Sequence, residues 1–359
     1  MQEHGAPIRG RGAAENPTGR FERLSVVADP DHMDESPEDA EDGPPWPVTK
    51  LLRDPSRSVV ARNDSPDLFF DASVNPYRGC EHGCIYCYAR PSHEYLGFSA
   101  GLDFETKVLV KEEAPELLRR ELSARSWVPQ VVALSGVTDC YQPAERRLGI
   151  TRRCLQVLAE FRNPVAIVTK SALVTRDADV LGELAGVGAA AVSVSITTLD
   201  PELQRRLEPR APRPGIRLGA IESLALAGIP VGVMIAPVIP GLNEHEIPRI
   251  AAAAAAAGAR FAGTVLLRLP HGVKELFEAW LERHYPDRRA KVMGRVRSVR
   301  GGRFNDPRFG SRMHGEGFYA DETRRLFESA CKRSGLVASR PHLTAAHFRR
   351  PCGDQLVLL

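Results

Sequence analysis

The fold is indicated most clearly by residues 165–198, VAIVTKSALVTRDADVLGELAGVGAAAVSVSITT. A short apolar run, Val165–Val168, is followed by a helical stretch around Val180–Leu184 and then by a second apolar run, Ala191–Ile196. Short buried strands that alternate with helices are typical of a parallel sheet, because a parallel connection needs a crossover long enough to hold a helix. This unit therefore predicts an α/β fold.

The same order of strand and helix continues on both sides of this unit. Further strands are expected at Leu68–Val74, Val131–Val137, Val231–Ile235 and Thr264–Leu267, and further helices at Pro115–Ala124, Arg152–Arg162, Leu218–Ala227 and Glu246–Ala257. Six such strands predict a partial (β/α)6 barrel of the TIM type over residues 67–275. In parallel barrels the chemistry collects at the carboxyl ends of the strands, so the polar residues that follow each strand are candidates for the site.

Both flanks differ in composition from the barrel. Residues 1–66 are rich in Pro, Gly and charged residues and predict an extended, partly disordered N-terminal arm, whose apolar pieces Phe21–Val27 and Val48–Leu52 could dock as it passes. Residues 276–359 are expected to form a basic C-terminal extension. Within it, Arg288–Arg312 holds nine Lys or Arg and one acidic residue, together with Phe304 and Phe309.

Two interpretations of that basic segment stay open. Its cations could follow a phosphate backbone while its aromatic rings stack on bases, which predicts a nucleic-acid partner. Alternatively, it is a solvated loop packed over the mouth of the barrel. The net charge of the whole chain is only +3, so global charge does not demand a nucleic-acid partner.

The bulk composition indicates a globular protein of the cytoplasm. The chain has 359 residues, of which 43% are hydrophobic, enough for one large core. Its 7 cysteines are odd in number and three of them are clustered, which argues against a secreted disulfide framework and favours a reducing compartment. No apolar run approaches the roughly 18 to 20 residues of a membrane span. We therefore expect no association with a membrane.

The loop after the first strand has the sequence NPYRGCEHGCIYCY over residues 75–88. Its cysteines Cys80, Cys84 and Cys87 have the spacing C-x3-C-x2-C. Three thiolates on one short loop can hold three corners of a four-iron cluster and leave the fourth iron open, whereas a structural cluster or a zinc site would want a fourth protein ligand. A zinc site completed by His82 or by a distant cysteine stays open as the alternative.

This cysteine spacing, with Tyr86 directly before the last cysteine, resembles the radical S-adenosylmethionine (SAM) superfamily. Other motifs resemble its spore photolyase-like branch, also known as DNA repair photolyase-like proteins. These motifs are TDCYQPAE at 138–145, TKS at 169–171, SITT at 195–198, LEPR at 207–210 and PVIPGLN at 237–243. The resemblance runs from about residue 66 to 275, and the flanks look like those of an uncharacterised bacterial subgroup of this branch. It does not identify a substrate.

The resemblance implies an enzyme with two cofactors, a [4Fe-4S] cluster held by Cys80, Cys84 and Cys87, and SAM bound to the open iron. Reductive cleavage of SAM would produce a 5'-deoxyadenosyl radical that abstracts a hydrogen atom from the substrate. A reducing partner such as flavodoxin or ferredoxin is implied as well. By analogy with the branch we expect a nucleic acid or a nucleotide-containing substrate. The alternatives are radical modification of a protein or small metabolite, and a non-catalytic iron–sulfur or zinc-binding protein.

The resemblance also predicts residues that bind SAM at the ends of the second and third strands. Thr138 and Asp139 follow the second strand, where superfamily members bind the amino group of the methionine moiety, and Glu145 is a further candidate. Lys170 follows the third strand and is expected to meet the methionine carboxylate. The alternatives are a helix cap for Asp139 and a structural ion pair for Lys170.

More SAM contacts are predicted around the fourth strand. Ser193 and Ser195 alternate with apolar residues, which places both hydroxyls on one face of the strand, toward the barrel lumen and the ribose. Polar packing without a ligand is the alternative. Arg210 follows this strand and resembles the carboxylate-binding arginine of the branch.

The adenine site is predicted from the loop after the fifth strand. Ile239 and Gly241 match part of the adenine pattern of the superfamily, in which Pro237 here replaces the first glycine. The ring of Tyr86 is expected to stack against the adenine. A plain core aromatic residue is the alternative.

Cys140 is the candidate catalytic residue. Spore photolyases use a hydrogen-donating cysteine on the second strand, and alignment on Asp139 places Gly136 near that position. Cys140 could substitute only if its loop curls inward; otherwise it is a buried free thiol. The resemblance therefore does not imply repair of thymine dimers.

Overall fold

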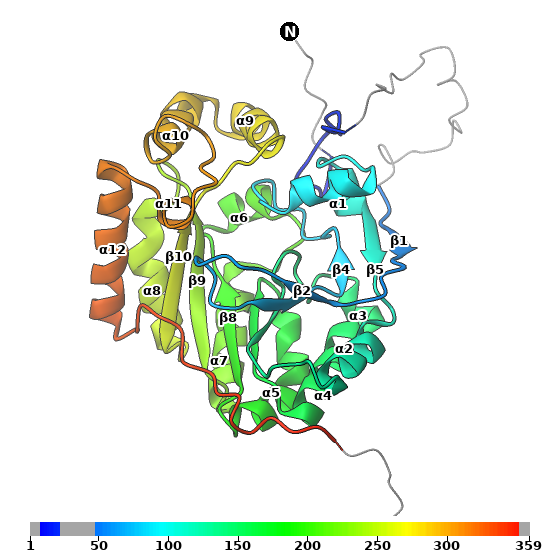
Figure 1. Cartoon of the computed structure of the whole chain (residues 1–359). Coiled ribbons are helices and arrows are strands. Elements are labelled where there is room, and N and C mark those ends of the chain that lie inside the picture. Colours follow the sequence, from blue (N-terminus) through cyan, green and yellow to red (C-terminus); the bar gives the residue numbers. More distant parts are fainter. Residues whose placement is uncertain (1–7, 22–46, 352–359) are drawn as a thin grey trace, which may run out of the picture.

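The computed structural model describes residues 8–21 and 47–351 (Figure 1). Its centre is a seven-stranded sheet in the order β10-β9-β8-β7-β6-β3-β2. The parallel strands are β3 (Ala72–Val74), β6 (Val132–Leu134), β7 (Val165–Thr169), β8 (Ala190–Ser195), β9 (Val231–Val238) and β10 (Phe261–Leu266). At the edge, β2 (Val60–Arg62) pairs antiparallel with β3. The predicted partial barrel of six parallel strands is confirmed.

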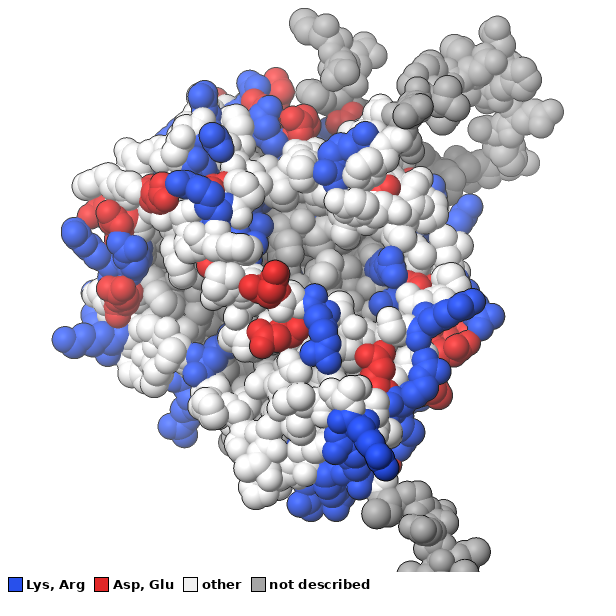
Figure 2. All heavy atoms as spheres, viewed as in Figure 1, with Lys and Arg blue, Asp and Glu red and all other residues white. Residues whose placement is uncertain are grey.

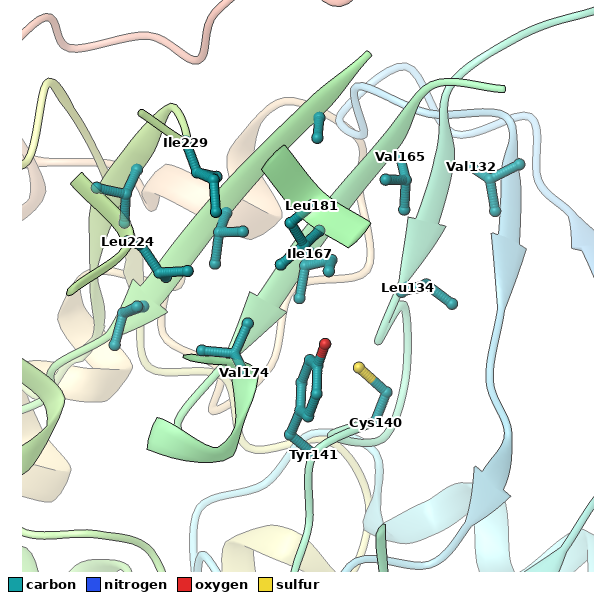
Figure 3. Packing of buried hydrophobic residues seen from close by; sticks show 14 of the residues in the cluster. Val132, Leu134, Cys140, Tyr141, Val165, Ile167, Val174, Leu181, Leu224 and Ile229 are labelled. Atoms are coloured by element: carbon teal, nitrogen blue, oxygen red, sulfur yellow. The ribbon is translucent and has the colours of Figure 1, made fainter. Parts of the chain in front are cut away.

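Helices cross over between the parallel strands and cover the outer face of the sheet. They are α2 (Ala114–Ser123), α4 (Ile150–Phe161), α5 (Ala178–Ala185), α7 (Pro214–Leu226) and α8 (Ile247–Ala256). The main hydrophobic core lies between these helices and the sheet, where Val165 and Ile167 of β7 face Leu181 of α5 (Figure 3). Alternate residues of each strand join this core, so the residues between them face the lumen.

The described part of the N-terminal arm is packed on the barrel. β1 (Lys50–Arg53) pairs in parallel with β5 (Lys107–Val110), and β4 (Tyr77–Arg78) pairs with β5 from the other side, which makes a second sheet beside the cysteine loop. The predicted docking of Val48–Leu52 takes this form. Most of the other predicted docking piece, Phe21–Val27, lies outside the described residues.

The C-terminal extension is mainly helical, with α9 (Val273–His284), α10 (Pro286–Ser298), α11 (Ser311–His314) and α12 (Phe318–Ser334). α12 packs on α8, and the chain then runs across the far end of the barrel (Figure 1). Arg300 is 2% exposed and donates hydrogen bonds to the carbonyls of Leu266, Leu267 and Arg312. The hydrogen bonds of this buried guanidinium therefore link the C-terminal extension to the end of β10.

The remaining short helical elements are α1 (Asp103–Thr106), α3 (Glu145–Leu148), α6 (Pro201–Leu207), η2 (Arg90–Leu96), η3 (Ala172–Asp177) and η4 (Glu244–Glu246). Across the part of the chain that the structure describes, every helix is too short or too polar to cross a bilayer.

Candidate functional site

The cysteine loop follows β3 and β4 and is shaped by two glycines. Gly79 and Gly83 have positive φ values of 86° and 65°. A Cβ at Gly79 would lie 3.0 Å from the carbonyl oxygen of Phe104, and one at Gly83 would lie 2.6 Å from a carboxylate oxygen of Glu105. Both the backbone angle and the lack of space therefore require glycine at the two positions that directly precede Cys80 and Cys84.

A buried ion pair holds this loop from behind. Arg90 and Glu105 are both 0% exposed, and Arg90 Nη2 lies 2.5 Å from Glu105 Oε1. Arg90 Nε also donates to the carbonyl of Cys84 at 3.0 Å. The Glu105 carboxylate binds the N-terminal arm as well, since Gly12 N and Ala13 N donate to it at 2.9 and 2.8 Å. Sequence reasoning missed this pair, because no local pattern links two residues that far apart.

The three cysteines form a donor set that suits an iron–sulfur cluster. Cys80 and Cys84 are buried, Cys87 is half-buried, and all three are free thiols. Burial raises the pKa of all three thiols. For Cys84 the pKa rises to about 12, because burial and the Glu208 carboxylate raise it more than Lys170 lowers it. Thiols of raised pKa stay protonated at neutral pH, so bound iron is what would ionise them.

His82, the alternative fourth ligand, is occupied by a different contact. Its Nδ1 lies 3.3 Å from Asp139 Oδ2, and its ring is 1% exposed. Its Nε2 has no hydrogen-bond partner among the described residues. Within residues 8–21 and 47–351, no three His, Cys, Asp or Glu side chains converge as the ligands of a single metal ion would. A four-iron cluster makes a different demand, because each of its three cysteines binds a separate iron.

Asp139 connects the ends of β6 and β7 to the cysteine loop. Its carboxylate accepts hydrogen bonds from Thr169 Oγ1 at 2.7 Å, from Lys170 N at 2.8 Å and from Tyr141 N at 2.9 Å. Burial would raise its pKa, but His82 and these hydrogen bonds outweigh burial and hold the pKa at about 2. The carboxylate is therefore ionised, and the protein itself supplies most of its hydrogen bonds.

Thr138 and Glu145 bind β4. Thr138 Oγ1 donates to the carbonyl of Tyr77 at 2.6 Å, and the hydroxyl of Tyr77 donates to Glu145 at 2.5 Å. Glu145 is fully buried and also pairs with Arg176 at 2.7 Å. Both side chains are thus engaged in contacts within the protein that involve neither Lys170 nor Tyr86.

A second buried network surrounds Tyr86. Glu208 is 0% exposed and accepts hydrogen bonds from the hydroxyl of Tyr86, from Thr197 Oγ1 and from Arg217. Lys170 Nζ lies 4.0 Å from Glu208 and 5.8 Å from the centre of the Tyr86 ring. Burial opposes ionisation of Glu208, but Arg217 and Lys170 outweigh it and hold its pKa at about 2.

Two arginines that follow β8, Arg210 and Arg217, differ in their relation to this network. Arg217 is 1% exposed and donates to the carbonyl of Ser195 at 3.0 Å as well as to Glu208. Arg210, the predicted SAM contact, pairs with Glu81 of the cysteine loop at 3.1 Å and takes no part in the Glu208 network. Sequence reasoning missed the role of Arg217 as the partner of Glu208. It included Glu208 in the LEPR motif that resembles the family, but it assigned no role to this residue.

The serines and the adenine loop lie beside this network. Ser193 and Ser195 are each 4% exposed and face away from the Val192–Val194 side of β8, on the lumen side as predicted from the alternation. Ile239 belongs to the same hydrophobic cluster as Tyr86. Gly241 has a φ of 90°, and its N–H donates to Glu244 at 2.8 Å.

Cys140 belongs to a different part of the molecule from these residues. It is fully buried in the main core beside Leu134 and Tyr141 (Figure 3). Burial raises the pKa of this thiol well above its ordinary value. Although it is the neighbour of Asp139 in sequence, the structure does not bring Cys140 together with Tyr86 and Lys170.

Comparison with known proteins connects this site to a family. A family model described as the Radical SAM superfamily matches residues 74–254. An uncharacterised protein of Mycobacterium tuberculosis is 40% identical over 220 residues, which cover 61% of this chain and 65% of the relative. An uncharacterised protein of Methanocaldococcus jannaschii is 30% identical over 173 residues, 48% of this chain and 62% of that protein. The chain thus matches less than two thirds of the length of these relatives.

Solved structures of spore photoproduct lyase share the fold. A mutant of that enzyme superposes with a TM-score of 0.58 at 17% sequence identity, covering 80% of this chain and 81% of the other. A second mutant, with bound AdoMet and dinucleoside spore photoproduct, also gives a TM-score of 0.58, at 15% identity and 80% coverage of both chains. At this level of identity the likeness concerns the fold.

Proposed function

The chain belongs to the radical SAM superfamily, and from this membership we propose that it cleaves SAM reductively at a [4Fe-4S] cluster held by Cys80, Cys84 and Cys87. When bound, the cluster supplies one electron that cleaves SAM to methionine and a 5'-deoxyadenosyl radical, which abstracts a hydrogen atom from the substrate. The observation that carries the proposal is the glycine-shaped cysteine loop, whose Tyr86 donates its hydroxyl to Glu208, 4.0 Å from the ammonium of Lys170.

The residues around Tyr86 suit the other cofactor, SAM. Lys170 has a side chain 16% exposed, and Glu208 is 4.0 Å away from its ammonium, so this ammonium can still bind a carboxylate of SAM. Tyr86 and Ile239 belong to one apolar cluster, which suits the adenine ring. Glu208, which accepts a hydrogen bond from Arg217, also accepts one from the hydroxyl of Tyr86 and thereby fixes its ring.

The substitution Lys170→Met tests the SAM site. Loss of one charge-assisted hydrogen bond costs about 1.5–3 kcal/mol, so we expect the Kd for SAM to rise about 10- to 150-fold. Calorimetry on the anaerobically reconstituted protein measures this change, and the iron content should stay that of the wild type. Lys274→Met, on α9, is the matched control and should leave the Kd unaltered. Equal affinity of the Lys170 variant and the wild type would remove Lys170 from the site.

The reaction itself is tested by product analysis. Reconstituted protein should be brown, and addition of dithionite and SAM should release 5'-deoxyadenosine, detected by mass spectrometry. Brown protein that binds SAM but forms no 5'-deoxyadenosine would contradict the proposal in favour of a non-catalytic iron–sulfur protein. A colourless protein that binds zinc would contradict the cluster.

We also propose a nucleic acid or a nucleotide-containing molecule as the substrate, on the basis of the basic segment Arg288–Arg312. Several of its cations are engaged elsewhere: Arg295 pairs with Glu244, Arg308 with Asp306 and Arg312 with Asp67. On the face shown in Figure 2, acidic side chains are interspersed among the basic ones around the C-terminal helices. The exposed cations that support the proposal are therefore fewer than the sequence suggests.

Charge reversal at Arg297 and Arg303 tests this substrate class. Both are exposed, and Arg297 lies over the ring of Phe304 at 5.6 Å, an arrangement that suits a stacked base. Arg297→Glu with Arg303→Glu should weaken binding of single-stranded DNA and reduce its salt slope by about 0.7 for each phosphate that the variant no longer neutralises. Fluorescence anisotropy at several salt concentrations measures both. If the wild type shows no salt-sensitive binding, the proposed substrate class is wrong.

A further inference from the structure

A basic pocket of about 540 Å³ opens on the outer side of the cysteine loop. Its lining contains four arginines and one carboxylate: Arg11, Arg146, Arg147, Arg210 and Glu81. We refer to this as the arginine pocket. Arg11 comes from the N-terminal arm, Arg146 and Arg147 from α3, and Arg210 from the loop after α6. Segments far apart in sequence therefore place an excess of positive charge at one point of the surface.

Two of these arginines are held rigidly. Arg11 is 8% exposed and donates to the carbonyl of Glu105 at 2.8 Å and to Thr49 Oγ1 at 3.1 Å. Arg210 pairs with Glu81 at 3.1 Å. Burial and the nearby Arg210 lower the pKa of Arg11, although the carboxylates of Glu105 and Glu81 raise it.

The other two arginines leave charge available to a partner. Arg146 and Arg147 are exposed, and within the described residues neither guanidinium has an ion pair or a hydrogen bond. Between the arginines the lining is apolar and includes Pro143 and Val48, whose side chain is 79% exposed. A small apolar centre with a charged rim is the usual composition of a protein-docking surface, and arginine is the cation that binds carboxylates in paired hydrogen bonds.

The lining of the arginine pocket includes a residue of the cysteine loop, but it includes none of the residues around Tyr86 that suit SAM. Glu81, in its lining, is the neighbour of Cys80 in the chain, and the N–H of Arg210 donates to the carbonyl of His82 at 3.3 Å. Tyr86, Lys170 and Glu208 are absent from the lining. A molecule seated in the pocket would therefore touch the loop that holds the cluster without displacing SAM.

These observations point to the source of the electron, and the inference rests on the proposed function, which consumes one electron for each SAM cleaved. We propose that the arginine pocket is the docking site of an acidic electron-transfer protein, a reduced flavoprotein. The donor is oxidised by one electron, which enters beside Cys80. That electron breaks one carbon–sulfur bond of the SAM sulfonium, so that methionine and the 5'-deoxyadenosyl radical account for all atoms and no proton is transferred.

Charge reversal of the two unpaired arginines tests this proposal. The variant Arg146→Glu with Arg147→Glu should bind reduced flavodoxin, the probe, at least about tenfold more weakly than the wild type, because each substitution turns an attraction into a repulsion. Calorimetry under anaerobic conditions measures the affinity, and raised salt should weaken the wild type more than the variant. Formation of 5'-deoxyadenosine should fall by a similar factor with flavodoxin at limiting concentration. With dithionite, which needs no docking surface, the rate should be unchanged.

A matched variant controls for net charge. Arg249→Glu with Arg333→Glu makes the same change of charge on α8 and α12, on the opposite side of the molecule from α3 and β1 (Figure 1). Affinity for flavodoxin should stay within about twofold of the wild type. The milder pair Arg146→Gln with Arg147→Gln, compared by melting temperature, checks that the effect is not a loss of folding.

Four results would overturn the inference. The first two are no binding of flavodoxin to the wild type, and equal binding by the wild type and the Arg146/Arg147 variant. The third is an equal loss of affinity in that variant and in the control, and the fourth is binding of pyrophosphate that the variant loses while it still binds flavodoxin. The last result would assign the pocket to a small phosphate ligand. Failure of the proposed function gives a different pattern, because dithionite would then yield no 5'-deoxyadenosine in the wild type.

Discussion

The substitution Cys84→Ala should abolish iron binding and SAM cleavage together. The wild type is expected to hold about four irons per chain after anaerobic reconstitution. The variant should stay colourless and release no 5'-deoxyadenosine with dithionite and SAM. The physical reason is that Cys84 is buried in the middle of the loop, and beyond its two fellow ligands no other cysteine in the described part of the chain lies on that loop to replace it. Iron analysis, visible absorption and product detection measure the three effects separately.

Cys154→Ala is the matched control for this result. Cys154 is also a buried free cysteine, but it lies on α4 in the main core. Its substitution removes a buried thiol away from the loop and should leave the iron content and the rate at wild-type levels. A Cys84→Ala protein that remained brown with nearly full iron content would contradict the assignment of the ligands.

The substitution Arg90→Met should destabilise the protein and empty the cluster site without removing any ligand. It leaves the Glu105 carboxylate buried without its cation, which typically costs about 3–5 kcal/mol. Because domains are stable by only about 5–15 kcal/mol, the loss should be large in proportion. It also frees the carbonyls of Cys84, Ala100 and Gly101, which Arg90 now binds. We expect a lower melting temperature and iron content well below that of the wild type.

Two further variants define the cause of that effect. Arg119→Met removes an ion pair with Glu160 whose side chains are 49% and 37% exposed, so it should cost less than about 1 kcal/mol. Arg90→Met combined with Glu105→Leu removes both charges and should recover part of the stability. Recovery should be incomplete, because Gly12 N and Ala13 N lose their acceptor. Unchanged melting and iron loading in the single variant would show that the pair does not support the loop.

Sequence reasoning located the strands of the barrel well because each strand is a short apolar run between a turn and a helix. The predicted Val165–Val168 and Val231–Ile235 correspond to β7 (Val165–Thr169) and β9 (Val231–Val238). The small sheet of β1, β4 and β5 was not predicted. Its strands are very short, and β1 pairs with a strand far along the chain, Lys50 opposite Lys107, so no local periodicity announces it.

The candidate site was predictable only where its residues are close together in the chain. Arg210 and Arg217 both follow the fourth parallel strand, yet one lies outside the cysteine loop and the other in the buried network of Glu208. Asp139 and Cys140 are adjacent, yet one reaches the cysteine loop and the other the main core. Neighbouring side chains that leave the backbone in different directions cannot be told apart by motif alone.

The sequence by itself determined the alternation of strands and helices, the family and the three cysteines of the loop, because these depend on residue type and short spacing. Only the tertiary structure decided what surrounds that loop: the Arg90–Glu105 pair behind it, the Glu208 network beside it and the arginine pocket outside it. The reason is that buried charges are stable only when a partner meets them in space. Such partners come from distant parts of the chain, so their pairing follows from the packing of the whole barrel.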